Sequence, residues 1–177
     1  AKLSKRHGAL GAENYRDMGF LPEAMCNYLL RLGWSHGDDE VITRLQAIDW
    51  FNTESIGKSP ARFDMAKLTN LNAHYIREAD NTRLMDLCSP LIEDNLQHKL
   101  STEHYDRILR GMDGLKQRAK TVLDLADSSL IYVRLAEHDE KALKFVTPES
   151  KALVREVITD LETVETFTEH DLDAQIR

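Results

Sequence analysis

The segment KLSKRHGA, residues 2–9, holds the side chains of this sequence that are best suited to phosphate chemistry. Lys2 and Lys5 flank Ser4, and Arg6 follows directly. A loop of this composition can place two ammonium groups on the oxygens of a polyphosphate. Cations in that position lower the barrier when charge develops on a leaving pyrophosphate. The same composition is also typical of a solvated basic tail, so these residues alone leave both interpretations open.

The elements that must position this segment are predicted to be helical. Residues 21–34, LPEAMCNYLLRLGW, have Pro22 where a first helical turn accepts it and Gly33 where a helix commonly stops. Residues 38–51, DDEVITRLQAIDWF, place acids at the start of a second helix. Its apolar stripe comprises Val41, Leu45, Ile48 and Phe51. Asp64 is the expected N-cap of a third helix.

Helical spacing continues to the end of the chain. Apolar stripes recur in residues 82–96, 101–115 and 120–135. In the last predicted helix Thr147 is the expected N-cap and Pro148 the first helical residue. Its stripe comprises Leu153, Val157, Leu161 and Val164. No alternation typical of strands competes with this pattern, and the predicted fold class is therefore all-α.

Composition narrows the class of protein further. A chain of 177 residues with 42% apolar content can bury one core or two small ones. It has no apolar run near the ~20 residues that cross a bilayer and no signal peptide, so we expect no membrane association and a cytoplasmic location. Cys26 and Cys88 are expected to be core side chains. The seven histidines lack the paired spacing of a zinc site, and no structural metal is predicted.

Charge is distributed unevenly along the chain. The net charge is -7, although proteins that bind nucleic acid usually show a basic surface. Residues 99–120 contain six cations and three acids, whereas residues 121–177 contain six cations and thirteen acids. A local basic face is therefore compatible with the acidic total.

Three segments, in this order and spacing, resemble bacterial glutamyl-tRNA synthetase, a class I aminoacyl-tRNA synthetase. They are KLSKRHGA, YRDMGFLPEAMCNYLLRLGWS and SPARFDMAKLTNLNAHYI, and they cover about residues 2–80. From there to Arg177 the resemblance lies in helical length and pattern, which agree with the first, helical part of that family's anticodon-binding region. The resemblance favours the loop interpretation of residues 2–9.

The resemblance implies that KLSKR is the family's version of the class I KMSKS loop. Lys2 and Lys5 would then be catalytic, helping to bind ATP and to stabilise the transition state of adenylate formation, with Lys5 the principal candidate. Ser4 and Arg6 would complete the ATP-binding loop, and Mg²⁺ would accompany ATP in the intact enzyme. Leu3 and Arg6 depart from the class motif in ways that are usual for the glutamyl branch.

The same resemblance implies three parts. Residues 1–8 would be the KMSKS-type catalytic loop, residues 9–79 a helical stem-contact domain, and residues 80–177 the truncated first part of an anticodon-binding helical bundle. The stem-contact domain would contact the inner corner of the tRNA and link the active site to the bundle. A change of charge and spacing around residues 79–82 marks the expected boundary.

Two groups of cations are candidate tRNA contacts. Lys58, Arg62 and Lys67 lie in or beside a connector, and its backbone amides and cations suit a sugar-phosphate backbone. The second group, which would lie along the anticodon stem, comprises Arg107, Arg110, Lys116 and Arg118. The other interpretation is that these side chains pair with neighbouring acids or cover an ordinary solvated face. The sequence leaves both interpretations open.

The chain lacks the features that would hold ATP and glutamate by themselves. It has no HIGH-type signature, no Gly-rich strand-to-helix turn and no parallel-sheet pattern. We therefore expect a C-terminal-side fragment of a ligase that charges tRNA(Glu) with glutamate through a glutamyl-adenylate, inactive by itself. ATP and glutamate would bind through the missing catalytic domain, tRNA(Glu) would be the partner, and the expected state is a monomer.

Another class of protein also fits the residues. A free-standing helical tRNA-binding or protein-interaction module, without catalysis, would leave the loop at Lys2 with no active site to close over. A helix-turn-helix DNA-binding protein is not favoured, because no predicted helix pair has the short turn and basic second helix of that motif. We expect no DNA partner.

Overall fold

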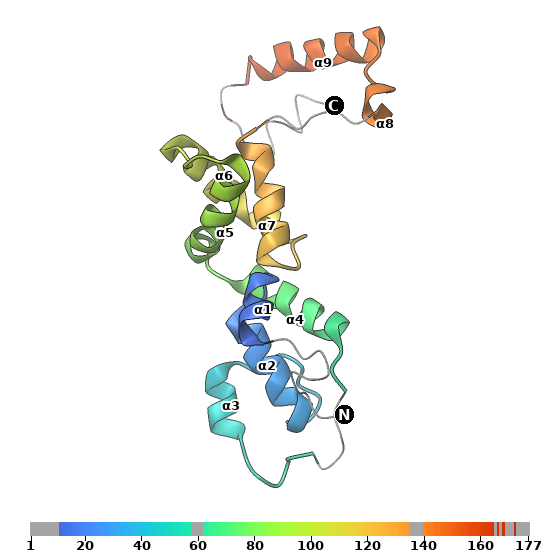
Figure 1. Ribbon diagram of the computed structural model, residues 1–177. Helices are drawn as coiled ribbons and strands as arrows, with labels where there is room; N and C mark the ends of the chain where they lie inside the picture. The colour runs from blue at the N-terminus through green and yellow to red at the C-terminus, as the bar shows by residue number, and fades with distance from the viewer. Residues whose placement is uncertain are drawn as a thin grey trace. The chain divides into compact units, whose positions relative to one another are not determined.

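The computed structural model describes residues 11–57, 62–134 and 140–164, together with Thr166, Thr168 and Leu172. Every regular element within these ranges is a helix, which confirms the all-α prediction. The α-helices, shown in Figure 1, are α1 (Ala12–Asp17), α2 (Pro22–Gly33), α3 (Arg44–Trp50), α4 (Met65–Glu78), α5 (Asn81–Leu96), α6 (Thr102–Lys116), α7 (Val122–Ser129), α8 (Glu140–Leu143) and α9 (Pro148–Leu161). A short 3-10 helix, η2 (Leu130–Tyr132), follows α7.

Several helix ends follow local signals in the sequence. α2 begins at Pro22, and Gly33 is its last residue, as predicted. The Asp64 carboxylate accepts hydrogen bonds from two backbone N–H groups in the first turn of α4. The Thr147 hydroxyl accepts one from the first turn of α9. These N-caps satisfy amides that have no partner inside the helix, which confirms both predicted caps.

The predicted start of the second helix is wrong. The acidic residues 38–40 lie in a loop, and α3 begins only after Thr43. The Thr43 hydroxyl accepts from the backbone N–H of Gln46, and the Gln46 side chain accepts from the backbone N–H of Thr43. This reciprocal capping box fixes the start of α3. The preceding loop is held instead by tertiary hydrogen bonds, which periodicity alone does not predict.

The apolar stripe of α3 does not pack into the core. Leu45 is 79% exposed and Ile48 is 68% exposed. Phe51, which follows the helix, is half exposed, although its ring lies 5.9 Å from that of Trp34. The aromatic residues Tyr28 and Trp34 are themselves buried.

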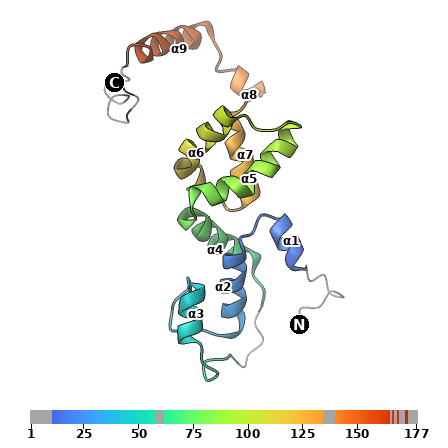
Figure 2. The same cartoon turned by 90° about the vertical axis from the view of Figure 1, so that its left-hand side faces the viewer.

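The described residues divide into two compact units at positions 135 and 136. In the first unit α5, α6 and α7 pack on one another, with α5 and α7 in the most extensive contact. Figure 2 shows these three helices grouped next to α4. Their fully buried side chains are Leu84, Met85, Cys88, Ile92, Ile108, Met112 and Leu125. The predicted boundary at residues 79 and 80 falls between α4 and α5, inside this unit, and stays a prediction.

The two cysteines differ in environment. Cys88 is buried in the core, as predicted, whereas Cys26 is exposed, so that prediction is wrong. The buried side chains of α2 are Ala24, Asn27 and Tyr28, which face α4. Cys26 lies off this face, and an apolar helical pattern does not by itself reveal which side is buried.

The second compact unit contains α8 and α9. α9 has the predicted N-cap, but it ends at Leu161, so Val164 of the predicted stripe lies beyond the helix. None of the residues of α9 is buried. Leu153 and Ile158 are at least half exposed. Of the predicted stripe only Leu153 is exposed, whereas Val157, Leu161 and Val164 are partly buried. The exposed apolar side chains of α9 therefore lie both on the stripe and beside it.

Candidate nucleic-acid interface

The predicted site residues fall into three groups. Lys2, Ser4, Lys5 and Arg6 lie outside the described residues, as does Lys58 of the connector, and their roles stay predictions. The structure describes the remaining candidates in two places. Arg62 and Lys67 line a groove between α2 and α4, and the others lie on α6 or just after it: Arg107, Arg110, Lys116 and Arg118.

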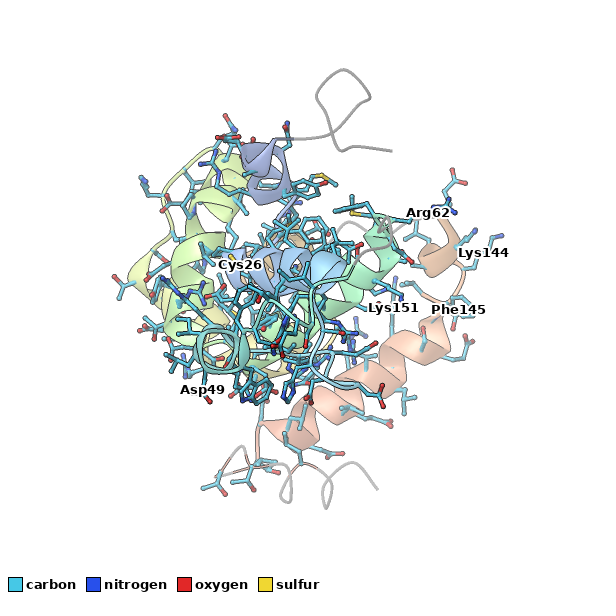
Figure 3. The ribbon with its side chains drawn as sticks, turned by 90° about the horizontal axis from the view of Figure 1, so that it is seen from below. Cys26, Asp49, Arg62, Lys144, Phe145 and Lys151 are labelled. Carbon is cyan, nitrogen blue, oxygen red and sulfur yellow. The ribbon has the colours of Figure 1, made fainter. Side chains whose placement is uncertain are left out.

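The groove between α2 and α4, called here the α2–α4 groove, has a volume of about 600 Å³. It brings Arg62, which precedes α4, together with Lys67 of the first turn of α4. Figure 3 looks at this end of the first unit from below, with Arg62 labelled beside the start of α4. Two residues that the sequence analysis missed, Arg31 of α2 and His74 of α4, also line it. The remaining lining residues are Tyr28, Leu32, Glu40, Val41, Asn70 and Leu71.

The spacing on α4 explains one of the missed residues. Lys67 and His74 are seven positions apart, with Asn70 and Leu71 between them, so all four share one helix face. That period was available from the sequence once Lys67 had been chosen. Spacing could not predict Arg31 in the same way, because its place in the groove depends on the packing of α2 against α4.

The charge of the α2–α4 groove is predominantly positive. Arg31, Arg62 and Lys67 are cations, and Glu40 is the one carboxylate among the described lining residues. None of these four side chains belongs to an ion pair of the described part of the chain. The Arg31 guanidinium donates to the backbone oxygen of Asp39, which leaves its charge uncompensated. The groove is therefore attractive to anions in a chain that is acidic overall.

Two adjacent residues of α2 fix the rims of the groove. Asn27, 3% exposed, accepts a hydrogen bond of 2.9 Å from the backbone N–H of Ile42 and donates one of 3.2 Å to the backbone oxygen of Glu40. The hydroxyl of Tyr28 accepts a hydrogen bond of 2.5 Å from the backbone N–H of Asp64, the N-cap of α4. These contacts hold both sides of the groove open before any ligand arrives, which lowers the ordering cost of binding.

Arg107, Arg110 and Arg118, called here the α6 arginine face, are exposed cations on or just after α6. The Arg107 guanidinium lies 2.5 Å from a carboxylate oxygen of Glu103. Arg110 donates through Nε to the backbone oxygen of Asp106, at 3.2 Å. Since a surface ion pair one helical turn apart contributes only about 0.3–0.5 kcal/mol, Arg107 can exchange its partner for a phosphate at little cost.

Lys116 differs from the other cations of this region. Its side chain is only 13% exposed, and its ammonium group lies 3.1 Å from a carboxylate oxygen of Asp113. It also donates to the side chain of Asn81 and to the backbone oxygen of Ala79. Hydrogen bonds from Asn81 and Lys116 lower the pKa of the Asp113 carboxyl. Lys116 thus ties α6 to the junction of α4 and α5, and contact with RNA would require exchange of these bonds.

A buried amide joins the groove helix to the α5–α7 core. Asn72 of α4 is 0% exposed. Its Oδ1 accepts a hydrogen bond from the backbone N–H of Leu21, and its Nδ2 donates to the backbone oxygens of Gly19 and Lys120. The residue before α2, α4 and the residues before α7 are therefore held together at one point. The two cationic regions consequently belong to one packed body.

No group of three or more metal-ligating side chains occurs among the described residues. In the same residues, no helix has both the length and the apolar character that a membrane span needs. The described groove presents cations, an amide and apolar side chains, together with Glu40 and His74.

Two family models match the chain. The model described as tRNA synthetases class I (E and Q), catalytic domain, matches residues 1–70. The model described as anticodon binding domain matches residues 83–177.

Curated relatives include several proteins named glutamate–tRNA ligase 2. The relative from Paramagnetospirillum magneticum is 60% identical over 85% of this chain, which corresponds to 32% of the relative. The relative from Parvibaculum lavamentivorans is 51% identical over 100% of this chain and 36% of its own length. The relative from Rhodospirillum rubrum is 52% identical over 98% of this chain and 37% of its own length. The chain thus spans about a third of the length of these relatives.

Solved structures give a similar result. A crystal structure of a glutamate tRNA ligase from Elizabethkingia meningosepticum matches 99% of this chain and 38% of its own, with a TM-score of 0.73 and 26% identity. A glutamate-tRNA synthetase from Elizabethkingia anophelis matches the same shares with a TM-score of 0.72 and 25% identity.

Proposed function

The chain belongs to the anticodon binding domain family, and we propose that it is the tRNA-binding part of a glutamate–tRNA ligase. Such an enzyme attaches glutamate to tRNA(Glu) with ATP, by way of a glutamyl-adenylate. The family match confirms the resemblance that the sequence motifs indicated. The observation that carries the proposal is the continuity of the match, since ligase relatives align over 98–100% of this chain.

The described geometry supports an RNA partner. The α2–α4 groove and the α6 arginine face both present cations that are not neutralised by buried carboxylates. Phosphate contacts by such side chains supply most of the sequence-independent affinity for nucleic acid. Arg62, Lys67, Arg107, Arg110 and Arg118 are the proposed tRNA contacts among the described residues, with Lys116 after exchange of its bonds and Lys58 from the connector.

The segment KLSKR is proposed to act at ATP. Lys2 and Lys5 would place compact, flexible charges on phosphate oxygens, and Ser4 and Arg6 would contribute further polar contacts. ATP with Mg²⁺ supplies the activation of glutamate in the whole enzyme. The part of the chain that would bind glutamate is proposed to lie in a catalytic domain outside these residues.

The proposed organisation keeps the three parts expected from the sequence. Residues 1–8 are the catalytic loop, residues 9–79 the stem-contact domain and residues 80–177 the first part of the anticodon-binding bundle. The protein is proposed to act as a cytoplasmic monomer, with tRNA(Glu), ATP and glutamate as its partners. No structural zinc is proposed.

Titration of fluorescent tRNA(Glu) with the chain at 50–200 mM salt tests this function. Affinity should fall steeply with salt, because phosphate contacts release counterions. Charge reversal in the variant Arg107→Glu/Arg110→Glu should flatten the slope by about 1 for each phosphate that the variant no longer binds. The matched control, Arg44→Glu/Arg77→Glu, changes the net charge equally at positions outside both cationic regions.

Three outcomes would contradict the proposal. Salt-insensitive binding would show that the interface is not electrostatic. Equal affinity for polyglutamate would show that the chain is not specific for RNA. Detectable ATP–pyrophosphate exchange by this chain alone would show that glutamate activation does not need another domain.

A further inference from the structure

The α2–α4 groove is a cavity with two kinds of wall. Cations line it from three separate segments, namely the end of α2, the residues before α4, and α4 itself. Leu32, Val41 and Leu71 supply apolar surface, and the largely buried ring of Tyr28 lies behind it. A uniformly charged surface would suit a phosphate alone, whereas this combination suits a ligand that joins an anion to a flat, partly apolar group.

We propose that the α2–α4 groove receives a single nucleotide of the bound RNA. Its phosphate contacts Arg31, Arg62 and Lys67, and its base or ribose packs on the apolar wall. The inference rests on the proposed function and deepens it, because it changes the role of this region from a backbone contact to a pocket that holds one unstacked nucleotide.

The size of the groove supports this occupant. About 600 Å³ lies within the range of ~300–1,000 Å³ that is usual for small-ligand pockets, whereas a lone phosphate needs far less space. The rims cannot close on the empty space, because Asn27 fixes the loop at Glu40 and Tyr28 fixes the N-cap of α4. A groove held in place in this way can receive a ligand without rearrangement of its rims.

The unpaired cations of the groove favour a ligand that carries a phosphate. Arg31 donates to a backbone oxygen, and neither Arg62 nor Lys67 is paired with a carboxylate of the described residues. Arg62 and Lys67 are exposed, so both side chains can reach a phosphate in the groove. Unstacked bases of single-stranded or looped RNA are the parts that proteins hold against aromatic and apolar side chains.

The experiment compares three double variants of the chain for binding to tRNA(Glu). The groove variant is Arg62→Gln/Lys67→Gln, the α6 variant is Arg107→Gln/Arg110→Gln, and the matched control is Arg44→Gln/Arg77→Gln. All three remove two charges. We expect the groove variant to bind about tenfold more weakly than the control and to lower the salt slope by about 2. Arg62→Lys/Lys67→Arg, which keeps both charges, should restore affinity and guards against misfolding of the groove variant.

A second measurement tests the apolar wall. Methyl resonances of Leu32, Val41 and Leu71 should shift when a short single-stranded RNA is added, and should stay in place with inorganic phosphate at equal concentration. Equal shifts with phosphate alone would show that the groove binds only an anion, and would overturn the proposal that it receives a nucleotide. Tight binding of a free nucleotide, or of polyglutamate, at the concentration that RNA requires would overturn RNA as the occupant.

The two proposals fail in distinguishable ways. If the groove variant binds tRNA(Glu) as well as the control does, while the α6 variant loses affinity, the nucleotide pocket is wrong and the proposed function stands. If the unchanged chain does not bind tRNA(Glu) at all, both proposals are wrong.

Discussion

Asn72 and Leu21 lie 51 positions apart in the chain, and the side-chain oxygen of Asn72 accepts a hydrogen bond of 2.7 Å from the backbone N–H of Leu21. The amide nitrogen of the same side chain donates to the backbone oxygen of Lys120 at 2.7 Å. One buried amide therefore satisfies backbone groups from two distant segments. Together with the Glu23–Arg83 ion pair, this amide holds the groove helices against the α5–α7 core.

Replacement of Asn72 by leucine should destabilise the first unit by about 2–4 kcal/mol. The substitution keeps the volume but leaves a buried N–H and a buried carbonyl without partners, each of which costs about 1–3 kcal/mol. Urea unfolding followed by the fluorescence of Trp34 and Trp50 measures the change. Asn70→Leu, on the exposed side of the same helix, is the control and should change stability little. Equal stabilities of the two variants would contradict the role of Asn72.

Replacement of Gly19 by alanine should also destabilise the first unit, by about 2–4 kcal/mol. Gly19 has φ +82°, and an added Cβ would lie 2.9 Å from the backbone nitrogens of Val122 and Leu123. Gly37→Ala is the matched control. Gly37 has φ +53°, and an added Cβ would have no atom within 4 Å. Only the left-handed backbone conformation would then destabilise this variant, by about 1 kcal/mol. Thermal unfolding of both variants should show the larger loss for Gly19. A larger loss of stability for Gly37→Ala would show that Gly19 does not lie close to the start of α7 in solution.

The ion pair between Glu23 of α2 and Arg83 of α5 predicts a pH dependence of stability. Burial tends to raise the pKa of the Glu23 carboxyl, but the hydrogen bond from Arg83, a backbone hydrogen bond and the Arg83 charge outweigh burial and lower the pKa below 4.5. A carboxyl whose pKa is lowered on folding stabilises the protein above its unfolded pKa. It loses that contribution as the pH falls through the folded pKa.

The comparison of the unchanged chain with Arg83→Gln tests this ion pair. The difference in unfolding free energy should be constant from pH 7 to about pH 5 and should shrink below pH 4.5. Both side chains are about 40% exposed, so the difference should be no more than about 1 kcal/mol. Arg77→Gln, at a cation without an ion pair among the described residues, should show no such change. A difference that grows on acidification would have the wrong sign for a stabilising pair.

The two thiols should react at very different rates. Burial raises the pKa of Cys88 to about 12, whereas Cys26 is exposed on α2. Because the thiolate is the reactive form, a thiol reagent at pH 8 should modify one cysteine per native chain and two in urea. Cys26→Ser should abolish the fast reaction, and Cys88→Ser should leave it unchanged. Fast modification of Cys88 in the native chain would show that the α5–α7 core opens readily.

Local signals in the sequence predicted helix ends well where the cap is a short-range contact. Asp64 and Thr147 were found because an N-cap bonds amides two or three residues away. The start of α3 was not found, since the acidic residues before it are held in a loop by Asn27 of α2. Exposure of Leu45 and Leu153 was not predictable either, because spacing identifies a helix face and not what covers it.

In the candidate site, too, local sequence predicts some residues and tertiary packing alone places the others. Arg62 and Lys67 were chosen for their charge and their place beside a connector, and the structure brings them together in a groove. His74 follows from the helical period of α4. Arg31 required knowledge of which helix packs against α4, and the burial of Lys116 required the position of Asn81.

The position of Asn72 on α4 has a consequence for the proposed RNA partner. Lys67 and His74, which line the groove, lie before and after Asn72 in the sequence of α4. The same helix also contacts α6. Under the proposed function, an RNA that reaches both the groove and the α6 arginine face would be held at two points that α4 and its buried amide connect. The proposed interface would then be sensitive to length, because a stem lengthened or shortened between those points would place its phosphates out of register with one of the two cationic regions.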